Sequence, residues 1–180
     1  MRVIAGAFKG RRLKPPTWDG LRPTSDKLRE TLFNILAARI PGARVLDGFA
    51  GTGAVGIEAL SRGAAHVTFV EADRRATALI RENLATCGIE AGYTIQQGQV
   101  TTLLRQSPPD ARFDVIVLDP PYEAPDVLEA LEAAADRLAE GGVLVLERAT
   151  RRDPSAPASL TRSRDVKSGD STLTFYTMAS

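Results

Sequence analysis

The alternation of apolar and polar segments predicts a chain that switches between strands and helices from residue 44 onward. Buried strands are predicted at 44–48, 66–71, 93–97, 113–118 and 143–147. Helices are predicted near 54–62, 73–86, 99–106 and 125–139. Such alternation is typical of a parallel sheet with helical crossovers on both faces, so we expect an α/β, Rossmann-like fold.

The carboxyl-terminal region is predicted to add an antiparallel hairpin to this sheet. Residues 151–158 are polar and broken by prolines, and two short strands are predicted near 160–166 and 172–178. Residues 168–171 read Ser-Gly-Asp-Ser and form the expected turn between these strands. We therefore expect about seven strands, mostly parallel, with the hairpin at one edge.

The first 43 residues are predicted to form a small accessory lobe. Its expected parts are a basic extended or hairpin segment at 2–14, a proline-marked loop at 15–23 and a helix at about 25–39. Thr24 or Ser25 is the expected N-cap of that helix. The predicted division is therefore a basic lobe at 1–43 and a larger α/β domain at 44–180.

Composition favours a globular protein without disulfides or a metal centre. Hydrophobic residues make up 43% and charged residues 25% of the 180 positions, which is typical of soluble domains. Cys87 is the only cysteine, so no internal disulfide can form, and no Cys/His cluster offers a metal site. The sequence has no 18-residue apolar run and no signal-peptide core, so we expect a cytoplasmic protein without a membrane partner.

The charges are unevenly distributed although the net charge is only +1. Residues 1–30 carry eight basic and three acidic side chains, whereas the segment 123–140 is predominantly acidic. Such asymmetry favours a face that binds a polyanion, although a solvated surface strand would look the same. Lys9, Arg11 and Arg12 are the candidate contacts to RNA phosphates.

A glycine-rich turn follows the first predicted strand of the α/β domain. Gly51, Gly53 and Gly56 match a nucleotide-binding pattern, and Glu71 lies 20 residues beyond Gly51, where an acid can bind ribose hydroxyls. Tight strand-to-helix packing alone would also require such glycines. Asp47 precedes them, where its negative charge favours the sulfonium and ammonium of S-adenosylmethionine over a pyrophosphate.

A second motif, Asp119-Pro120-Pro121-Tyr122, follows the buried strand 113–118. The two prolines stiffen the turn and remove two N–H donors, which leaves carbonyl acceptors facing outward. An acidic side chain and a proline carbonyl can then accept the hydrogens of a planar exocyclic amine, while the tyrosine ring stacks on the base. The alternative is a rigid turn with an incidental acid.

Taken together, these motifs resemble those of the bacterial 16S rRNA guanine-N2 methyltransferases. The resemblance covers the chain from its start to the final hairpin. It rests on the segments 9–13, 22–34, 47–53, 58–64 and 119–122. It implies a class I methyltransferase that uses S-adenosylmethionine, needs no metal, and modifies one guanine of 16S rRNA in a small-subunit assembly particle, as part of ribosome biogenesis.

The motifs and the resemblance together give a set of expected site residues. The expected catalytic residues are Asp119, Pro120 and Tyr122. The expected cofactor contacts are Arg22, Thr24, Asp47, Phe49, Ala50, Gly51, Thr52, Gly53, Gly56, Glu71, Gln99 and Asp119. Gln99 stands where many class I enzymes carry an acid, and its carbonyl can accept from the adenine amine. Arg22 and Thr24 either order the following helix or close the lobe over the methionine end of the cofactor.

Three other functions fit parts of the sequence. An amino-methyltransferase acting on DNA or on a protein amide would use the same Asp-Pro-Pro-Tyr turn. An NAD-dependent oxidoreductase would use the glycine pattern, but the chain has no room for a second domain. A non-enzymatic RNA-binding subunit would not need either motif. His66 is interpreted as structural, and Trp18 either stacks on RNA or covers the lobe.

Overall fold

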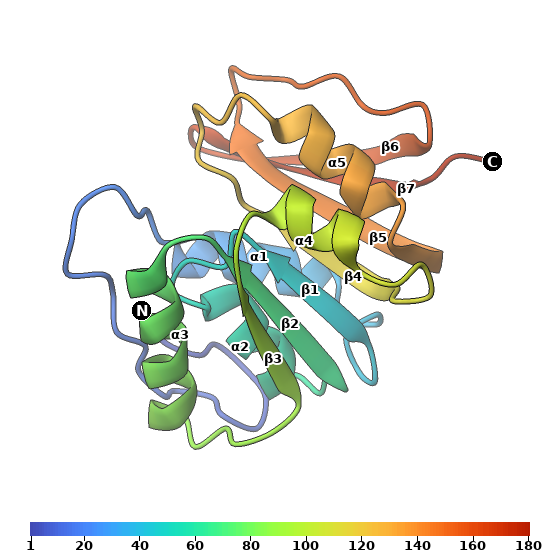
Figure 1. The fold of residues 1–180 in the computed structure, drawn as a ribbon. Coiled ribbons are helices and arrows are strands. Elements are labelled where there is room, and N and C mark those ends of the chain that lie inside the picture. Colours follow the sequence, from blue (N-terminus) through green and yellow to red (C-terminus); the bar gives the residue numbers. More distant parts are fainter.

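Seven strands form one sheet in the computed structural model, which describes residues Met1 to Ser180 (Figure 1). The strands are β1 (Arg44–Gly48), β2 (His66–Glu71), β3 (Tyr93–Gln97), β4 (Phe113–Leu118), β5 (Leu138–Ala149), β6 (Leu160–Ser168) and β7 (Ser171–Met178). Their order across the sheet is β3-β2-β1-β4-β5-β7-β6. Strands β1 to β5 pair in parallel, and β7 is antiparallel to β5 and β6. The expected mostly parallel sheet with a terminal hairpin is confirmed.

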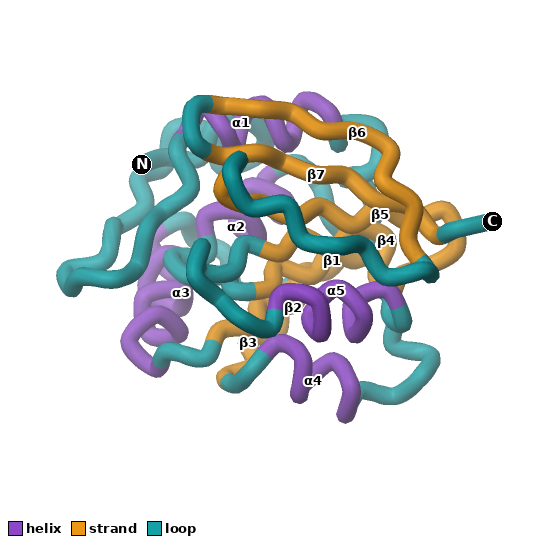
Figure 2. Tube along the Cα trace, turned by 90° about the horizontal axis from the view of Figure 1, so that it is seen from above, coloured by secondary structure: helices purple, strands orange, loops and turns teal.

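Five helices cover the two faces of this sheet. They are α1 (Asp26–Ile35), α2 (Ala54–Ser61), α3 (Arg74–Thr86), α4 (Val100–Gln106) and α5 (Val127–Ala135). Helices α1, α2 and α3 pack in one core cluster of 26 buried residues, whereas α4 and α5 pack in another of 17 on the opposite face (Figure 2). No helix is both long and apolar enough to cross a membrane.

The bounds of the elements agree with the predicted ones to within two residues, except around β5 and at the end of α1. Strands β1 to β4 match residue for residue, but β5 begins at Leu138 instead of residue 143, and α5 is shorter at both ends than the predicted helix 125–139. The reason is a long-range pairing, because Leu138 lies opposite Phe113 and the register shifts before Val115. Gly142 permits this irregularity, since a Cβ there would lie 3.0 Å from the carbonyl oxygen of Asp114.

The first residues of the chain form a hairpin-like segment that packs against α2. The Val3 N–H donates to the Arg11 carbonyl at 2.9 Å, which supports the predicted hairpin at 2–14. Glu58 of α2 accepts from the backbone N–H groups of Ile4 and Ala5 at 2.8 and 3.1 Å. Val3 is fully buried in the 26-residue cluster, so this segment shares its core with the sheet.

Helix α1 follows this segment and packs in the 26-residue core cluster. Ser25 is its N-cap, with the hydroxyl accepting from the Leu28 N–H at 3.1 Å. The helix ends at Ile35, four residues before the predicted end. Arg29 on its inner face is fully buried, pairs with Asp26 at 2.6 Å and lies 3.7 Å from Glu58. Because Ser25 is the cap, the Thr24 hydroxyl is free to serve elsewhere.

Candidate active site

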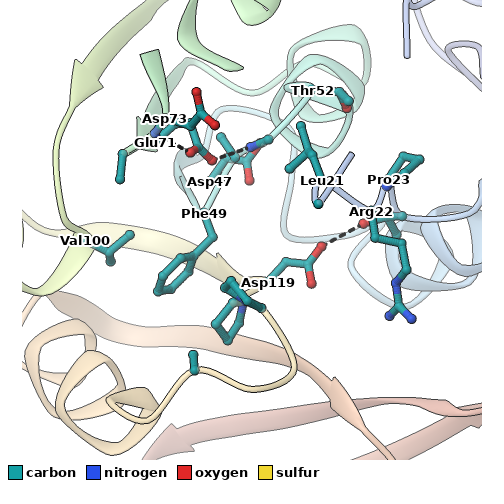
Figure 3. Close-up of a pocket in the computed structure, with 18 of the residues that line it drawn as sticks. Leu21, Arg22, Pro23, Asp47, Phe49, Thr52, Glu71, Asp73, Val100 and Asp119 are labelled. Atoms are coloured by element: carbon teal, nitrogen blue, oxygen red, sulfur yellow. Dashed lines mark hydrogen bonds between the residues drawn. The ribbon is translucent and has the colours of Figure 1, made fainter. Parts of the chain in front are cut away.

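A cavity of about 690 Å³ opens at the carboxyl ends of β1, β2 and β4. Its walls are the loop after β1 (residues 49–52), the start of α2 (54–55), the turn after β2 (within 71–75) and the Asp-Pro-Pro-Tyr turn after β4 (119–122). Residues 18–24 of the amino-terminal region line it as well (Figure 3). The carboxyl ends of parallel strands share one edge of the sheet, so the motifs that are far apart in sequence converge there.

The loop after β1 is held in a conformation that brings its backbone to the cavity. Phe49 has a φ of 58° and is the only non-glycine residue with a positive φ, a strained geometry that is typical of ligand-binding loops. Gly51 has a φ of 57°, and a Cβ there would lie 3.2 Å from a methyl carbon of Leu21. The segment that contains Leu21 therefore lies directly on this loop.

Glu71, at the end of β2, presents a fixed carboxylate to the cavity (Figure 3). One oxygen accepts from the Gly51 N–H at 2.9 Å and the other from the Asp73 N–H at 2.8 Å. A carboxylate oxygen has more than one lone pair, so each can also accept from a ligand hydroxyl. The arrangement suits the two neighbouring hydroxyls of a ribose.

Asp47 is a buried acid without a cationic partner. Its side chain is 2% exposed and accepts from the Gly56 N–H at 2.9 Å. Burial raises the pKa of Asp47 from about 3.8 to about 8, and the nearby charge of Glu71 adds to the increase, although the Gly56 hydrogen bond opposes it. A ligand cation beside this carboxyl would compensate for the lost solvation and lower the pKa again.

Asp119 lies next to a second acid, Glu147, at the end of the neighbouring strand β5. The Thr24 hydroxyl lies 3.0 Å from Asp119 Oδ2 and 3.2 Å from Glu147 Oε2. Burial raises the pKa of both carboxyls, and the charge of Glu147 raises that of Asp119 further. The Thr24 hydroxyl therefore links the two acids.

Tyr122 is fixed by three neighbours. The Arg22 guanidinium lies over its ring, 3.8 Å from the ring centre, which is a cation–π contact. The phenol oxygen is hydrogen-bonded to the Ser171 hydroxyl, where β7 begins, and Arg152 donates to the Tyr122 carbonyl at 2.8 Å. One ring face is therefore already covered by Arg22, and the turn 168–171 supports the tyrosine from behind.

Most of the predicted site residues line the cavity. They are Arg22, Thr24, Asp47, Phe49, Ala50, Gly51, Thr52, Glu71, Gln99, Asp119, Pro120 and Tyr122. Gln99 precedes α4 and its side chain makes no capping hydrogen bond, so the amide is available to a ligand.

Two predicted contacts, Gly53 and Gly56, do not line this cavity. Gly53 turns the chain into α2 with a φ of 82°, and a Cβ at Gly56 would lie 2.2 Å from the Phe69 ring. Gly56 serves close helix-to-strand packing and donates to Asp47.

The basic residues at the amino terminus lie away from the cavity. Arg11 donates to the Cys87 carbonyl just beyond α3, whereas Asp73, at the start of α3, lines the cavity. The thirteen residues of α3 span about 20 Å, so Arg11 lies about that far from the cavity wall at Asp73. Arg11 thus also stabilises a helix end, while Lys9 and Arg12 are exposed beside it.

Sequence reasoning missed Glu147 and Asp73. Glu147 belongs to neither predicted motif. The available signal was that an acid ends the predicted strand 143–147. Asp73 caps α3 by accepting from the Arg75 N–H at 2.8 Å. Arg75 in turn lies over Trp18, 4.8 Å from the ring centre, so Trp18 covers the rim of the cavity. No group of His, Cys, Asp and Glu side chains is arranged to hold a metal ion.

Comparison with known proteins identifies close relatives. The family described as "Conserved hypothetical protein 95" matches residues 1–177. Ribosomal RNA small subunit methyltransferase D of Escherichia coli is 35% identical over 179 residues, 98% of this chain and 89% of the relative. The enzyme of the same name from Haemophilus influenzae is 44% identical over 124 residues, 68% of this chain but 64% of that protein.

Solved structures agree with this fold. The Escherichia coli protein yhhF, named only provisionally as a methyltransferase, has a TM-score of 0.87 at 35% identity and covers 99% of this chain and 97% of its own. A Pyrococcus horikoshii protein, provisionally an RNA methyltransferase, has a TM-score of 0.75 at 18% identity over 93% of this chain and 94% of its own. The expected Rossmann-like class I methyltransferase fold is confirmed.

Proposed function

The chain belongs to the family of the ribosomal RNA small subunit methyltransferases D, and we propose that it transfers a methyl group from S-adenosylmethionine to the exocyclic N2 amine of one guanine in 16S rRNA. The observation that carries this proposal is the meeting of Glu71, Asp47 and the Asp-Pro-Pro-Tyr turn around one cavity. These groups fit a nucleoside, a cation and a planar amine, respectively.

The residues of the cavity fit S-adenosylmethionine. Glu71 offers two oxygens to a ribose, and the unpaired Asp47 is suited to the positive end of the molecule. Gln99 would accept from the adenine amine. When bound, S-adenosylmethionine supplies an electrophilic methyl group on a sulfonium. No residue of the chain has to be modified for the transfer.

Asp119 and Pro120 would orient the accepting amine. The lone pair of this nitrogen is delocalised into the purine ring, so the amine is a weak nucleophile. If Asp119 Oδ and the Pro120 carbonyl accept its two hydrogens, the nitrogen becomes pyramidal and its lone pair points at the methyl group. The N–C bond forms as the C–S bond breaks, and the cationic amine then releases one proton to the Asp119 carboxylate. Orientation and electrostatics supply the acceleration.

The RNA is proposed to contact the protein at two separated places. Tyr122 would stack on the target base with the ring face that Arg22 does not cover, a contact of roughly 1–3 kcal/mol. Lys9 and Arg12 would bind phosphates about 20 Å away along α3. Such a separation suits a large folded RNA, such as the rRNA within a small-subunit assembly particle.

The test is transfer of labelled methyl from S-adenosylmethionine to small ribosomal subunits that lack the modification, followed by nucleoside analysis. We expect N2-methylguanosine in the 16S rRNA. Asp119→Ala should lower turnover by about 10²–10³-fold, because one transition-state contact is removed. Binding of S-adenosylmethionine, measured by calorimetry, should stay within a few-fold of wild type.

Asp114→Asn is the matched control, because Asp114 lies on the same strand and accepts from the Arg44 N–H at the other end of the sheet. This variant should keep full activity. Near-normal turnover of Asp119→Ala would remove Asp119 from the mechanism. Methylation of a DNA base or a protein amide in place of guanine would replace the proposed substrate by the alternative one.

A further inference from the structure

A second cavity of about 470 Å³ lies on the other side of the Asp-Pro-Pro-Tyr turn. Its walls are this turn and residues 146–155 from the end of β5 and the following loop. Leu128 of α5 and Leu146 of β5 contribute apolar surface, and Glu147 is an acid in its lining. Its volume lies in the usual range for ligand sites. The first cavity, by contrast, contains Asp119 and not Glu147.

The two cavities meet at a pair of acids. Parallel pairing places Leu118 opposite Leu146, so the next residues, Asp119 and Glu147, lie side by side. Glu147 is only 5% exposed, and its side chain makes one hydrogen bond, with the Thr24 hydroxyl that also contacts Asp119. A carboxylate can accept several hydrogen bonds, so this buried acid has capacity for further donors.

We propose that the second cavity binds the flipped target base and that Glu147 selects guanine by accepting a hydrogen bond from its N1–H. Asp119 accepts a hydrogen bond from the neighbouring N2 amine. This inference rests on the proposed function. The Watson–Crick edge of guanine presents N1–H and N2–H₂ side by side, which are donors facing two neighbouring acceptors. Adenine presents a bare N1, which has no hydrogen to donate to Glu147. A base must leave its stack to enter such a pocket.

Glu147 is thus a specificity residue as well as a partner of Thr24. A purely structural role, in which Glu147 only anchors the segment 18–24 through Thr24, makes a different prediction. In that case, substitution of Glu147 would lower methylation of every target base equally. A target base that keeps the N2 amine but lacks the N1 hydrogen distinguishes the two roles.

The experiment uses 2,6-diaminopurine at the methylated position. Once that nucleotide is mapped in small subunits, ligated 16S rRNA carrying guanine or 2,6-diaminopurine there is assembled into subunits and methylated by wild type and Glu147→Gln. Wild type should prefer guanine in kcat/KM by roughly tenfold to a hundredfold. In Glu147→Gln this preference should fall by about tenfold or more, because the amide can donate to the bare N1.

Glu140→Gln is the control, since Glu140 is an exposed acid on the same strand β5 that lines neither cavity and forms no ion pair. It should keep the wild-type preference. An unchanged preference in Glu147→Gln would overturn the proposal. So would equal use of both bases by wild type, which needs no variant to fold. If wild type methylates no guanine amine at all, the proposed function itself fails, and this outcome is distinct from the other two.

Discussion

The two sides of the first cavity hold their acids by different means. On the β1–β2 side, Asp47 and Glu71 accept hydrogen bonds from backbone N–H groups of the loop and helices that follow the same strands. On the β4–β5 side, Asp119 and Glu147 depend on one side chain, Thr24, that comes from the amino-terminal region. The acids of the first side are held by the α/β core alone, whereas those of the second are held only when Thr24 is in place.

This difference indicates which substitutions should affect cofactor binding and turnover separately. Side-chain substitutions other than proline leave backbone donors in place, so the cofactor side is best disturbed through its acids. The acceptor side should be disturbed through Thr24 without effect on the cofactor. The following expectations test this division, in order of decreasing effect.

The largest effect is expected on stability from Asp47→Asn. The pKa of Asp47 is raised to about 8, so its protonated form contributes stability that is complete below about pH 4 and is lost as the pH rises through 8. The ligand-free wild type should therefore lose on the order of a few kcal/mol between pH 5 and pH 8. The asparagine variant should lose less, as measured by urea unfolding at both pH values. If wild type and variant lost the same free energy of unfolding between the two pH values, Asp47 would not be a protonated buried acid.

Glu71→Gln should weaken cofactor binding by roughly tenfold to a hundredfold, because charge-assisted hydrogen bonds to ribose are lost. The amide also leaves one of its two backbone N–H partners without an acceptor. Turnover at saturating S-adenosylmethionine should be nearly retained. Calorimetry and steady-state kinetics measure the two quantities, with Glu82→Gln on the exposed face of α3 as the control. A loss confined to turnover would contradict the assignment of Glu71 to the cofactor side.

Thr24→Val should lower turnover by roughly tenfold and leave cofactor binding unchanged. The variant keeps the shape of the side chain but removes the hydroxyl between Asp119 and Glu147, and an unsatisfied buried polar group costs about 1–3 kcal/mol. Ser25→Ala is the control, because it removes the neighbouring helix cap without touching the acids. Equal losses in cofactor binding and turnover would mean that the two sides are not independent.

The smallest effect is expected from Lys9→Gln combined with Arg12→Gln. If both side chains bind phosphates, the dependence of RNA affinity on salt should become shallower by one to two in the log–log slope, roughly one for each contact. Arg11 is left intact because it also holds the end of α3. Arg105→Gln, on α4 across the sheet, is the control. An unchanged slope would make the basic hairpin structural.

The sequence was sufficient for the parts of the fold that depend on local pattern. Strands such as β1 and β4 are short apolar runs bounded by polar residues or glycine, and their limits were predicted correctly. The early start of β5 could not be predicted, because it arises from the pairing of Leu138 with Phe113 across the sheet.

The site shows the same limit. Asp47, Glu71 and Asp119 belong to local motifs and could be named in advance. Glu147 ends a predicted strand, but its place beside Asp119 comes from the register between β4 and β5, which no local pattern encodes. The sequence shows that Lys9, Arg11 and Arg12 are basic but not where they lie on the surface. Their position depends on how the hairpin docks on α2 and α3.

The docking of the amino-terminal hairpin also has a consequence for synthesis. Ile4 and Ala5 are held by Glu58, and the Lys14 N–H donates to Asn83 at 2.8 Å. At about 5–20 residues per second, the hairpin waits several seconds after its own translation before α3 exists. During this interval its apolar residues have no core to enter. Until α3 has emerged, this hairpin is therefore exposed to chaperones and to aggregation.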